Sequence, residues 1–303
     1  MSGIKIRGTG RFAPAKIVTN DDLAKIVDTS DEWITTRTGI QTRHHCTTET
    51  HTDMCVGAAR QALENAGISP EDIGACVVAT FSSDYLSPSA ACMVQRGLGL
   101  PHDAVCFDLN AACSGFLFAI HTMECLLAQA PRKYGLVIGA EMLSRFINWE
   151  DRGTCVLFGD GAGAVVVEWR EDYPSIHAVL GCHGDPDMLG VPGAEKPAPA
   201  RIFMHGQPTF KFAVKAVPYC IDQVLEKAGM AIEDVDFFVF HQANARIIDL
   251  AAKKYHIPPE KYYKNIQKYG NTSAASIPLV ISELHDLGKV GPGSRVLVVG
   301  FGG

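Results

Sequence analysis

The sequence contains no apolar run near the roughly 20 residues that span a bilayer. Its first residues, Met1–Lys5, are not followed by the long apolar stretch of a secretory signal peptide, so we expect a cytoplasmic location. There is also no run of Lys or Arg, and the net charge is −6. Neither nucleic acid nor a membrane surface is therefore predicted as a partner, and any acidic partner must meet a local basic patch.

None of the ten cysteines forms a Cys-x-x-Cys pair, so the signatures of zinc ribbons and thioredoxin-like proteins are missing. Most cysteines lie in apolar runs such as Ala75–Val78, where a reduced Cys acts as a small hydrophobic residue. His44, His45, Cys46 and His51 are close in sequence, but their spacing matches no ordinary zinc motif. No metal site is predicted.

Short apolar runs alternate with longer helical patterns, which is typical of an α/β fold. The chain of 303 residues exceeds the usual size of one hydrophobic core, so two packed halves are expected. The segment Gly159–Ala164 is rich in glycine but leads into a strand instead of a helix, which excludes a dinucleotide fingerprint and favours a tight turn. The predicted buried strands are Cys76–Phe81, Ala104–Leu109, Leu136–Ala140, Ala164–Trp169, Phe237–Phe240 and Val296–Phe301.

An internal repeat supports two similar halves. Leu63–Gly67 and Leu225–Gly229 share four of five residues at an offset of 162 (225 minus 63) and end predicted helices over 53–65 and 214–227, the second with a kink at Pro218. Similar strands follow in both halves, and Leu136–Ala140 resembles Leu297–Phe301. Chance matches are the alternative. We interpret the near-constant offset as duplication, with halves 1–170 and 171–303 and an irregular loop over 183–199.

Cys113 has the most suggestive setting of the ten cysteines. It follows the predicted strand Ala104–Leu109 and precedes an apolar helical pattern that extends to about Ala130. A helix N-terminus favours the thiolate, which is the nucleophilic form of cysteine. Its neighbours are small and leave room for a substrate. A buried structural role remains the interpretation for the other nine, and Cys113 is predicted to be a nucleophile.

Two further residues could assist a thiolate. His241 ends the predicted strand Phe237–Phe240 and could manage protons or negative charge, although a structural hydrogen-bonding role is equally consistent with its position. Asn271 lies in the small, polar segment Gly270–Pro278, and the repeat offset pairs Ala275 with Cys113. Asn271 could donate to an oxyanion, or it could be a turn or cap residue.

At these motifs the sequence resembles the β-ketoacyl-acyl-carrier-protein synthase III family of thiolase-like condensing enzymes. The resemblance covers nearly the whole chain, and its combination of Cys, His and Asn differs from the Cys with two His of elongating synthases. It implies a five-layered αβαβα fold built from two duplicated halves. The segments that carry it are Asp28–Ile34, Arg37–Ile40, Ala111–Phe116, Leu157–Ala164, His241–Ile248 and Gly270–Ser276.

The resemblance implies a reaction in two steps. An acyl-CoA, typically acetyl-CoA, would acylate Cys113, with the N–H groups of Cys113 and Gly303 as the oxyanion hole. Malonyl acyl carrier protein would then lose CO₂ while His241 and Asn271 hold the enolate oxygen, and the carbanion would attack the acyl group. No cofactor is implied, because acyl-CoA is a substrate.

The same resemblance implies roles for surface residues and a homodimer. Thr29, Trp33, Arg37 and Arg152 would contact CoA, with Trp33 an exposed ring stacked on the adenine. Lys211 and Arg246 would meet the acidic carrier protein.

One departure and three alternatives stand beside this interpretation. The family continues past Gly303 with a final strand, and lacking it would leave Gly303 mobile and the activity weak.

A related enzyme of secondary metabolism, a thioester hydrolase or a catalytically silent carrier-protein-binding homologue would share the fold. Ser87, in the family's acyl-pocket wall, suggests room for longer or branched primers.

Overall fold

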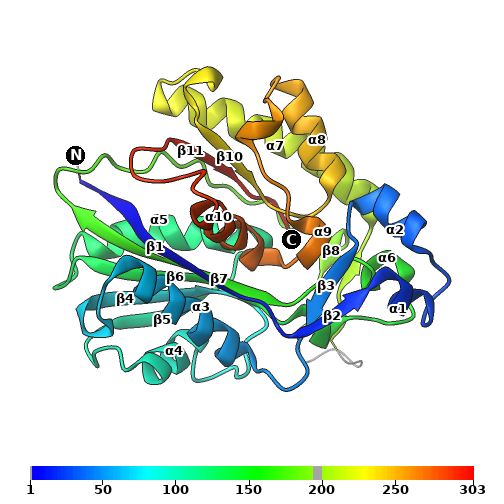
Figure 1. Cartoon of the computed structure of the whole chain (residues 1–303), viewed down its shortest axis with the longest axis horizontal. Helices are drawn as coiled ribbons and strands as arrows, with labels where there is room; N and C mark the ends of the chain where they lie inside the picture. The colour runs from blue at the N-terminus through cyan, green and yellow to red at the C-terminus, as the bar shows by residue number, and fades with distance from the viewer. Residues whose placement is uncertain (1, 194–199) are drawn as a thin grey trace.

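The computed structural model describes residues 2–193 and 200–303. Its largest sheet has five strands in the order β1-β7-β6-β4-β5 (Figure 1). The strand β4 is parallel to β5 and β6, whereas β7 is antiparallel to β1 and β6. The strands are β1 (Gly3–Phe12), β4 (Ile73–Ala79), β5 (Val105–Leu109), β6 (Tyr134–Glu141) and β7 (Gly161–Arg170).

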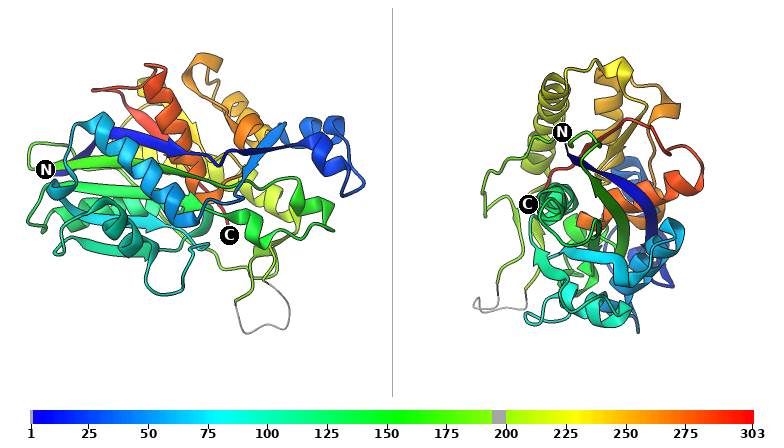
Figure 2. Two further views of the ribbon diagram at one scale, coloured as in Figure 1. Left: turned by 60° about the horizontal axis from the view of Figure 1, so that its bottom comes forward. Right: turned by 90° about the vertical axis from the view of Figure 1, so that its left-hand side faces the viewer.

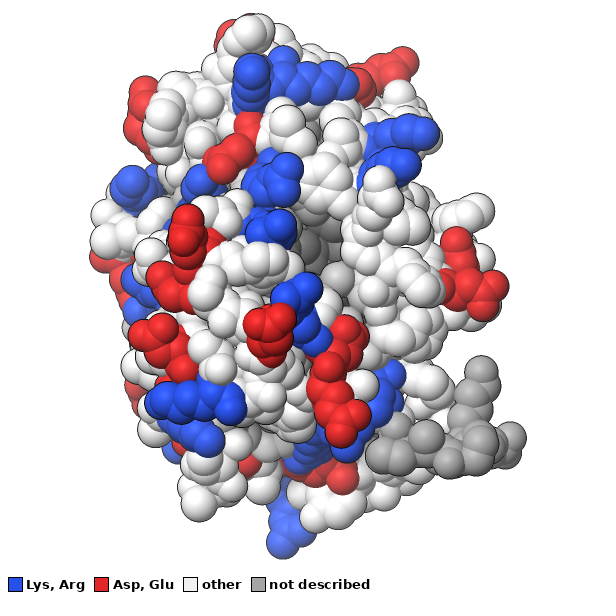
Figure 3. Space-filling model, turned by 90° about the vertical axis from the view of Figure 1, so that its right-hand side faces the viewer, with Lys and Arg blue, Asp and Glu red and all other residues white. Residues whose placement is uncertain are grey.

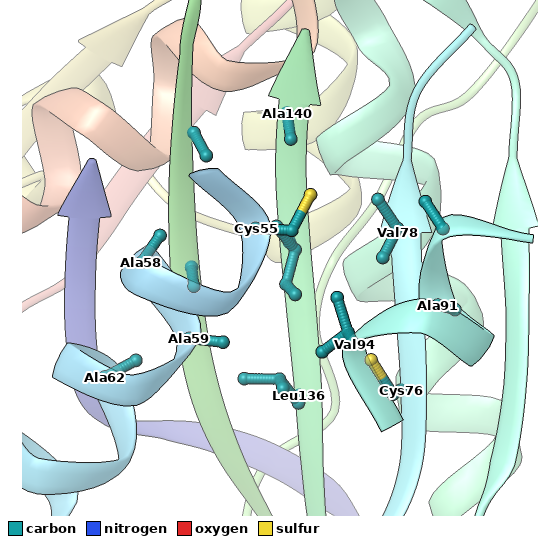
Figure 4. Packing of buried hydrophobic residues seen from close by; sticks show 14 of the residues in the cluster. Cys55, Ala58, Ala59, Ala62, Cys76, Val78, Ala91, Val94, Leu136 and Ala140 are labelled. Carbon is teal, nitrogen blue, oxygen red and sulfur yellow. The ribbon is translucent and has the colours of Figure 1, made fainter. Parts of the chain in front are cut away.

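Two helices, α3 (His51–Ala66) and α4 (Ala90–Leu98), cover one face of this sheet. The helix α3 begins with a capping box at Thr50 and ends at Gly67, which adopts the left-handed conformation. Its alanines lie over β1, β7 and β6, close to Leu136, whereas Val78 of β4 lies beside Ala91 of α4 (Figure 4). Small side chains at this contact let the helix lie close to the sheet, and the interface is buried.

The opposite face of the sheet contacts α5 (Gly115–Leu127) and α10 (Ser276–Asp286). The helix α10 also touches β10 (Phe237–Phe240), which pairs in parallel with β11 (Val296–Val299). Almost every residue of α10 is therefore buried, since it packs between two layers of strands.

The outer face of β10 and β11 is covered by α7 (Gly206–Ala228) and α8 (Ala245–Lys254) (Figure 2). From one side to the other the layers are α3 and α4, the five-stranded sheet, α5 and α10, β10 and β11, then α7 and α8. This order confirms the predicted five-layered αβαβα architecture.

Smaller elements form one end of the molecule, on the right of Figure 1. They include two small antiparallel sheets, β2 with β3 and β8 with β9, and short helices. The elements are β2 (Lys16–Thr19), β3 (Thr42–His45), β8 (Leu189–Gly190), β9 (Phe203–Met204), α1 (Asn20–Ala24), α2 (Asp31–Thr38), α6 (Arg152–Cys155) and α9 (Ile266–Tyr269). Elsewhere along the chain, short 3-10 turns occur at Pro70–Asp72, Ala112–Ser114, Leu143–Phe146, Ile232–Asp234, Pro259–Lys261 and Ser273–Ala275. Among the described residues, no helix is both long and apolar enough to cross a bilayer.

Several predicted boundaries were wrong. The helix α7 begins at Gly206, eight residues before the predicted start, and contains Pro218 in its interior. The predicted loop 183–199 contains the short strand β8, while residues 194–199 lie outside the described residues. A tight turn was predicted over Gly159–Ala164, but the strand β7 already begins at Gly161. Glycine is needed here for close packing, since a Cβ on Gly163 would lie 2.7 Å from the backbone of Pro278 and Leu279.

The repeated pattern recurs in the structure. Gly67 and Gly229 end α3 and α7 with φ of 65° and 62°. The turns before α5 and α10 each hold a non-glycine residue with positive φ, 43° at Ala112 and 48° at Ser273. This correspondence has an offset of 161 (273 minus 112), so Cys113 pairs with Ala274 and not with the predicted Ala275.

Candidate active site

Cys113 lies in the turn between β5 and α5, as predicted, and is 9% exposed. Burial raises the pKa of its thiol to about 11. We predicted that the helix N-terminus would favour the thiolate, whereas burial of the sulfur acts in the opposite direction and disfavours the charged form. With this pKa the sulfur is a thiol at neutral pH.

The chain's last residues close over this sulfur. A Cβ on Gly302 would lie 2.5 Å from the Cβ and 2.8 Å from the Sγ of Cys113, so only glycine fits there. The backbone N–H groups of Gly303 and Cys113 lie beside the sulfur and lower the pKa of its thiol.

His241 follows β10 and is 2% exposed. The backbone N–H of His241 donates to the Val299 carbonyl at 2.8 Å. The His241 ring meets the Phe301 ring edge-on, with centroids 5.4 Å apart. Burial lowers the pKa of the imidazole to about 3, so the ring is neutral. Its Nδ1 lies 2.6 Å from Ser276 Oγ, which also accepts from the Gln242 N–H. A Ser276 hydroxyl that donates to Nδ1 places the ring proton on Nε2, where it can be donated to a ligand.

Asn271 is oriented by its own turn. Its backbone exchanges hydrogen bonds with Leu157 (2.8 Å) and Gly159 (3.0 Å). Its Oδ1 accepts from the Ser273 N–H at 2.9 Å. Because the oxygen is fixed in this way, the Nδ2 group is the part of the amide that can donate to a ligand.

The three predicted residues are brought together by contacts between the turns. The Cys113 turn touches the Ser273–Ala275 turn, and the Ser273 hydroxyl lies close enough to the Cys113 thiol to lower its pKa. Phe301 and Gly302 are adjacent in sequence and touch His241 and Cys113 respectively. A thiol, a neutral imidazole and an amide therefore share one buried site. Such a set can form an acyl-thioester and stabilise an enolate.

The predicted CoA contacts form a separate cluster. Trp33 lies on α2 and is half-buried, less exposed than predicted, because the guanidinium groups of Arg37 and Arg152 lie 4.5 Å and 4.8 Å from its ring centroid. The Thr29 hydroxyl is buried without a hydrogen-bond partner in the described part of the chain. A hollow of about 390 Å³ adjoins Arg152, lined by Ile26, Val27, Asp28, Glu150 and Arg152. Figure 3 shows this side of the molecule, hollowed near its middle with Lys and Arg side chains along the rim.

Lys211 and Arg246 are both exposed, on the neighbouring helices α7 and α8. The Arg246 guanidinium lies 5.5 Å from the Phe210 ring centroid. An apolar groove of about 210 Å³ runs between the same helices. The two positive charges therefore lie on one surface, although they are 35 residues apart in the sequence (246 minus 211).

Sequence reasoning missed three residues that hold this site. Ser276 binds the His241 ring, and Ser273 joins the Asn271 amide to the Cys113 thiol. Glu141 is fully buried at the end of β6, one residue beyond the predicted strand. A carboxyl that ends an apolar strand was the available signal, since charged residues are rarely buried without a partner. Within the described residues no cluster of ligands suits a metal ion.

Comparisons with known proteins agree with the fold. Residues 107–184 match the family profile 3-oxoacyl-[acyl-carrier-protein] synthase III, and residues 225–303 match its C-terminal profile. The β-ketoacyl-[acyl-carrier-protein] synthase III of Clostridium acetobutylicum is 46% identical, with 100% of this chain and 96% of that protein covered. A crystal structure of 3-oxoacyl-[acyl-carrier-protein] synthase III from Aquifex aeolicus is 47% identical, with a TM-score of 0.92 over 98% of this chain and 95% of that one.

A polyketide enzyme is similar too. The priming β-ketosynthase of the R1128 biosynthetic pathway is 34% identical, with a TM-score of 0.93 over 99% of this chain and 92% of that one. The sequence similarity over the full length of the chain, the two profile matches and the shared architecture all indicate the same family. The chain belongs to the β-ketoacyl-acyl-carrier-protein synthase III family of acyltransferase-type condensing enzymes, which carry out the initiating condensation of fatty-acid synthesis.

Proposed function

We propose that Cys113 takes an acyl group from acyl-CoA, with acetyl-CoA as the expected primer. The observation that carries this proposal is the position of two backbone N–H groups, from Cys113 and Gly303, beside the buried Cys113 sulfur. The sulfur attacks the thioester carbonyl, the C–O⁻ of the tetrahedral intermediate accepts from those N–H groups, and CoA leaves as a thiol. The product is an acyl-thioester on Cys113.

In the second step, malonyl acyl carrier protein loses CO₂ and the resulting carbanion attacks the acyl carbonyl. The Nε2–H of His241 and the Nδ2 group of Asn271 donate to the thioester oxygen on which enolate charge develops. A neutral imidazole suits this role, because it donates without a proton transfer. Departure of CO₂ drives the condensation forward, and Cys113 is released as a thiol.

Substrate contacts follow from the surface clusters. The Trp33 ring, between the cations Arg37 and Arg152, suits the adenine and phosphates of CoA, and Thr29 lies beside them. Lys211 and Arg246 suit the acidic carrier protein. No cofactor is required by this chemistry.

We propose a cytoplasmic homodimer built from chains whose halves are 1–170 and 171–303. The edge strand β5 has a half-exposed Val105, and the nearby Leu86 is fully exposed. An unpaired edge with apolar side chains favours association with a second copy. In such a dimer the segment around Ser87 would reach the partner's acyl pocket, and its small side chain would admit longer or branched primers.

A second candidate function is priming of a polyketide pathway, favoured by the similarity to the R1128 enzyme. The chemistry on Cys113 would be the same, and the acyl-CoA and the carrier protein would differ. Acetyl-CoA, isobutyryl-CoA and hexanoyl-CoA should be compared as primers. Use of acetyl-CoA alone would indicate a narrow acyl pocket, and use of the two larger primers would indicate a wide one.

The test is the intact mass of the protein after incubation with acetyl-CoA alone. We expect one acetyl adduct on the wild-type chain and none on Cys113→Ala. The other nine cysteines provide an internal control, because their acetylation would leave an adduct on the variant. An adduct that survives the substitution, or no adduct with any of the three primers, would refute the proposal.

A further inference from the structure

The buried carboxyl of Glu141 has no part in the steps above, yet it lies beside the residues that perform them. It ends β6 and is completely inaccessible to solvent. Its Oε2 accepts from three groups after β4: the Thr80 hydroxyl at 3.2 Å, the Phe81 N–H at 3.4 Å and the Ser82 hydroxyl. Its Oε1 faces a different partner, the Ser273 hydroxyl at 3.5 Å.

This division of partners fixes where a proton on the carboxyl would lie. Three donors occupy Oε2, so a proton can be held only on Oε1, the oxygen that faces Ser273. Burial raises the pKa of Glu141 to about 8, because the ionised form is poorly solvated there. The neutral acid is therefore the main form at pH 7.

The Ser273 hydroxyl has a single hydrogen and two possible acceptors, Glu141 Oε1 and Cys113 Sγ. When Glu141 is ionised, its carboxylate attracts that hydrogen. When Glu141 is protonated, it donates to Ser273 Oγ, and the Ser273 hydrogen is free to point at the sulfur. A thiolate is stabilised by such a donor and opposed by a nearby carboxylate.

We propose that Glu141 is a positioning residue that acts in its neutral form: it donates through Ser273 towards Cys113, and its ionisation weakens the nucleophile. This inference rests on the proposed role of Cys113. The backbone N–H of Ser273 separately holds the Asn271 oxygen, and this contact does not involve the carboxyl. The device gives the enzyme an upper pH limit for nucleophile activation.

Other titratable groups around Glu141 do not change charge in the same pH range. His51 contacts Thr80 Oγ1 at 3.0 Å, and burial lowers the pKa of its ring. Burial raises the pKa of Cys55, beside His51, well above its ordinary value. Arg145 binds the Ser82 and Ser83 carbonyls and pairs with Asp84, whose pKa is lowered to about 2. A change near pH 8 would thus be a property of Glu141.

The test measures alkylation of Cys113 by iodoacetamide, followed by peptide mass, from about pH 6.5 to about pH 9.5. For the wild-type chain we expect a rate that rises about tenfold per pH unit and flattens near pH 8. In Glu141→Gln the amide donates to Ser273 as the neutral acid does but cannot ionise. Its rate should match wild type within about twofold at low pH and exceed it at least about tenfold at pH 9.5.

Two more variants separate this mechanism from a structural effect. Ser273→Ala removes the link, and alanine is compatible with the turn because Ala112 has the same backbone conformation. It should slow alkylation about fivefold at low pH, the usual value of one hydrogen bond. Glu168→Gln changes another buried carboxyl of the same sheet, paired with Arg7 and Lys133, and should follow the wild-type profile.

A wild-type profile that rises without a bend to pH 9.5 would overturn the proposal without any variant. So would a Glu141→Gln profile that keeps the bend, or a Ser273→Ala rate equal to wild type. The acetyl-adduct assay keeps the two proposals distinct. A normal adduct with an unbent profile removes only the role of Glu141, whereas a bent profile without an adduct removes only the acyl-transfer function.

Discussion

At the scale of single residues, burial determines how His241 and Asn271 can act. The imidazole has a pKa of about 3, so it stays neutral across the physiological range. The Asn271 oxygen is held by the Ser273 N–H, so the Nδ2 group of its amide is the part that can donate to a ligand. Under the proposed function, both side chains would donate to the developing oxyanion, and neither would remove the thiol proton.

Replacement of either donor should therefore separate the two half-reactions. We expect His241→Ala and Asn271→Ala to lower the rate of condensation about 100-fold to 1000-fold, the usual loss for one oxyanion donor. Both should still form the acetyl adduct on Cys113. Condensation is measured with labelled acetyl-CoA and malonyl acyl carrier protein. Loss of the adduct together with condensation would show that these residues act on the thiol instead.

At the scale of elements, the site depends on how closely α10 approaches the sheet. Gly139 in β6 lies against the turn that carries Ser273, and a Cβ there would be 2.2 Å from the Ala274 carbonyl oxygen. Gly163 makes the equivalent contact with the first turn of α10. These glycines are selected for their missing side chain, since neither has a positive φ.

Gly139→Ala should destabilise the fold by about 1–3 kcal/mol, because backbone atoms must move to admit the methyl group. The measurement is urea unfolding, with a lower midpoint and an unchanged slope. Gly181→Ala is the control, since no atom lies within 4 Å of its added Cβ, and it should stay within about 0.5 kcal/mol of wild type. Equal stability of Gly139→Ala and the control would contradict the packing argument.

At the scale of the whole molecule, a net charge of −6 coexists with a basic pair on α7 and α8. Double charge reversal, Lys211→Glu with Arg246→Glu, should lower kcat/KM for malonyl acyl carrier protein at least about tenfold and leave acetylation by acetyl-CoA unchanged. The loss should shrink as salt is added. Lys289→Glu, a change of exposed charge on the loop before β11, is the control. A uniform loss in both assays would point to misfolding.

The free energy of unfolding should also depend on the protonation of the buried Glu141 carboxyl. The pKa of Glu141 is raised from 4.5 to about 8 in the folded chain, so the folded state binds the proton more tightly than the unfolded state. This contribution is fully present below about pH 4.5 and is lost as pH rises to about 8. The free energy of unfolding of wild type, relative to Glu141→Gln, should therefore fall between pH 5.5 and about 8.5 in urea titrations. A difference that rises with pH would contradict the assignment.

The sequence alone indicated an α/β fold with two similar halves and the nucleophile's turn, whereas the five layers were implied by the family resemblance. Apolar runs of strand length and glycine-ended helices are local signals, and the repeat of Leu63–Gly67 at Leu225–Gly229 was visible without coordinates. The strand Phe237–Phe240 was predicted to the residue, because it is buried on both faces and bounded by polar residues. The α7 start was missed, because Gly206 is a weak helix former and Pro208, which is tolerated in a first helical turn, gives no periodic apolar signal.

Only the tertiary structure decided the electrostatics of the site. Position at a helix N-terminus predicted an acidic thiol, whereas enclosure by Gly302 and the Ser273 turn desolvates the sulfur and raises its pKa. The partners of Glu141, which ends β6, come from two other stretches of chain, after β4 and before α10. Local sequence fixes which groups are available, but desolvation and hydrogen bonding depend on atoms brought near by folding, and these decide which proton each group holds.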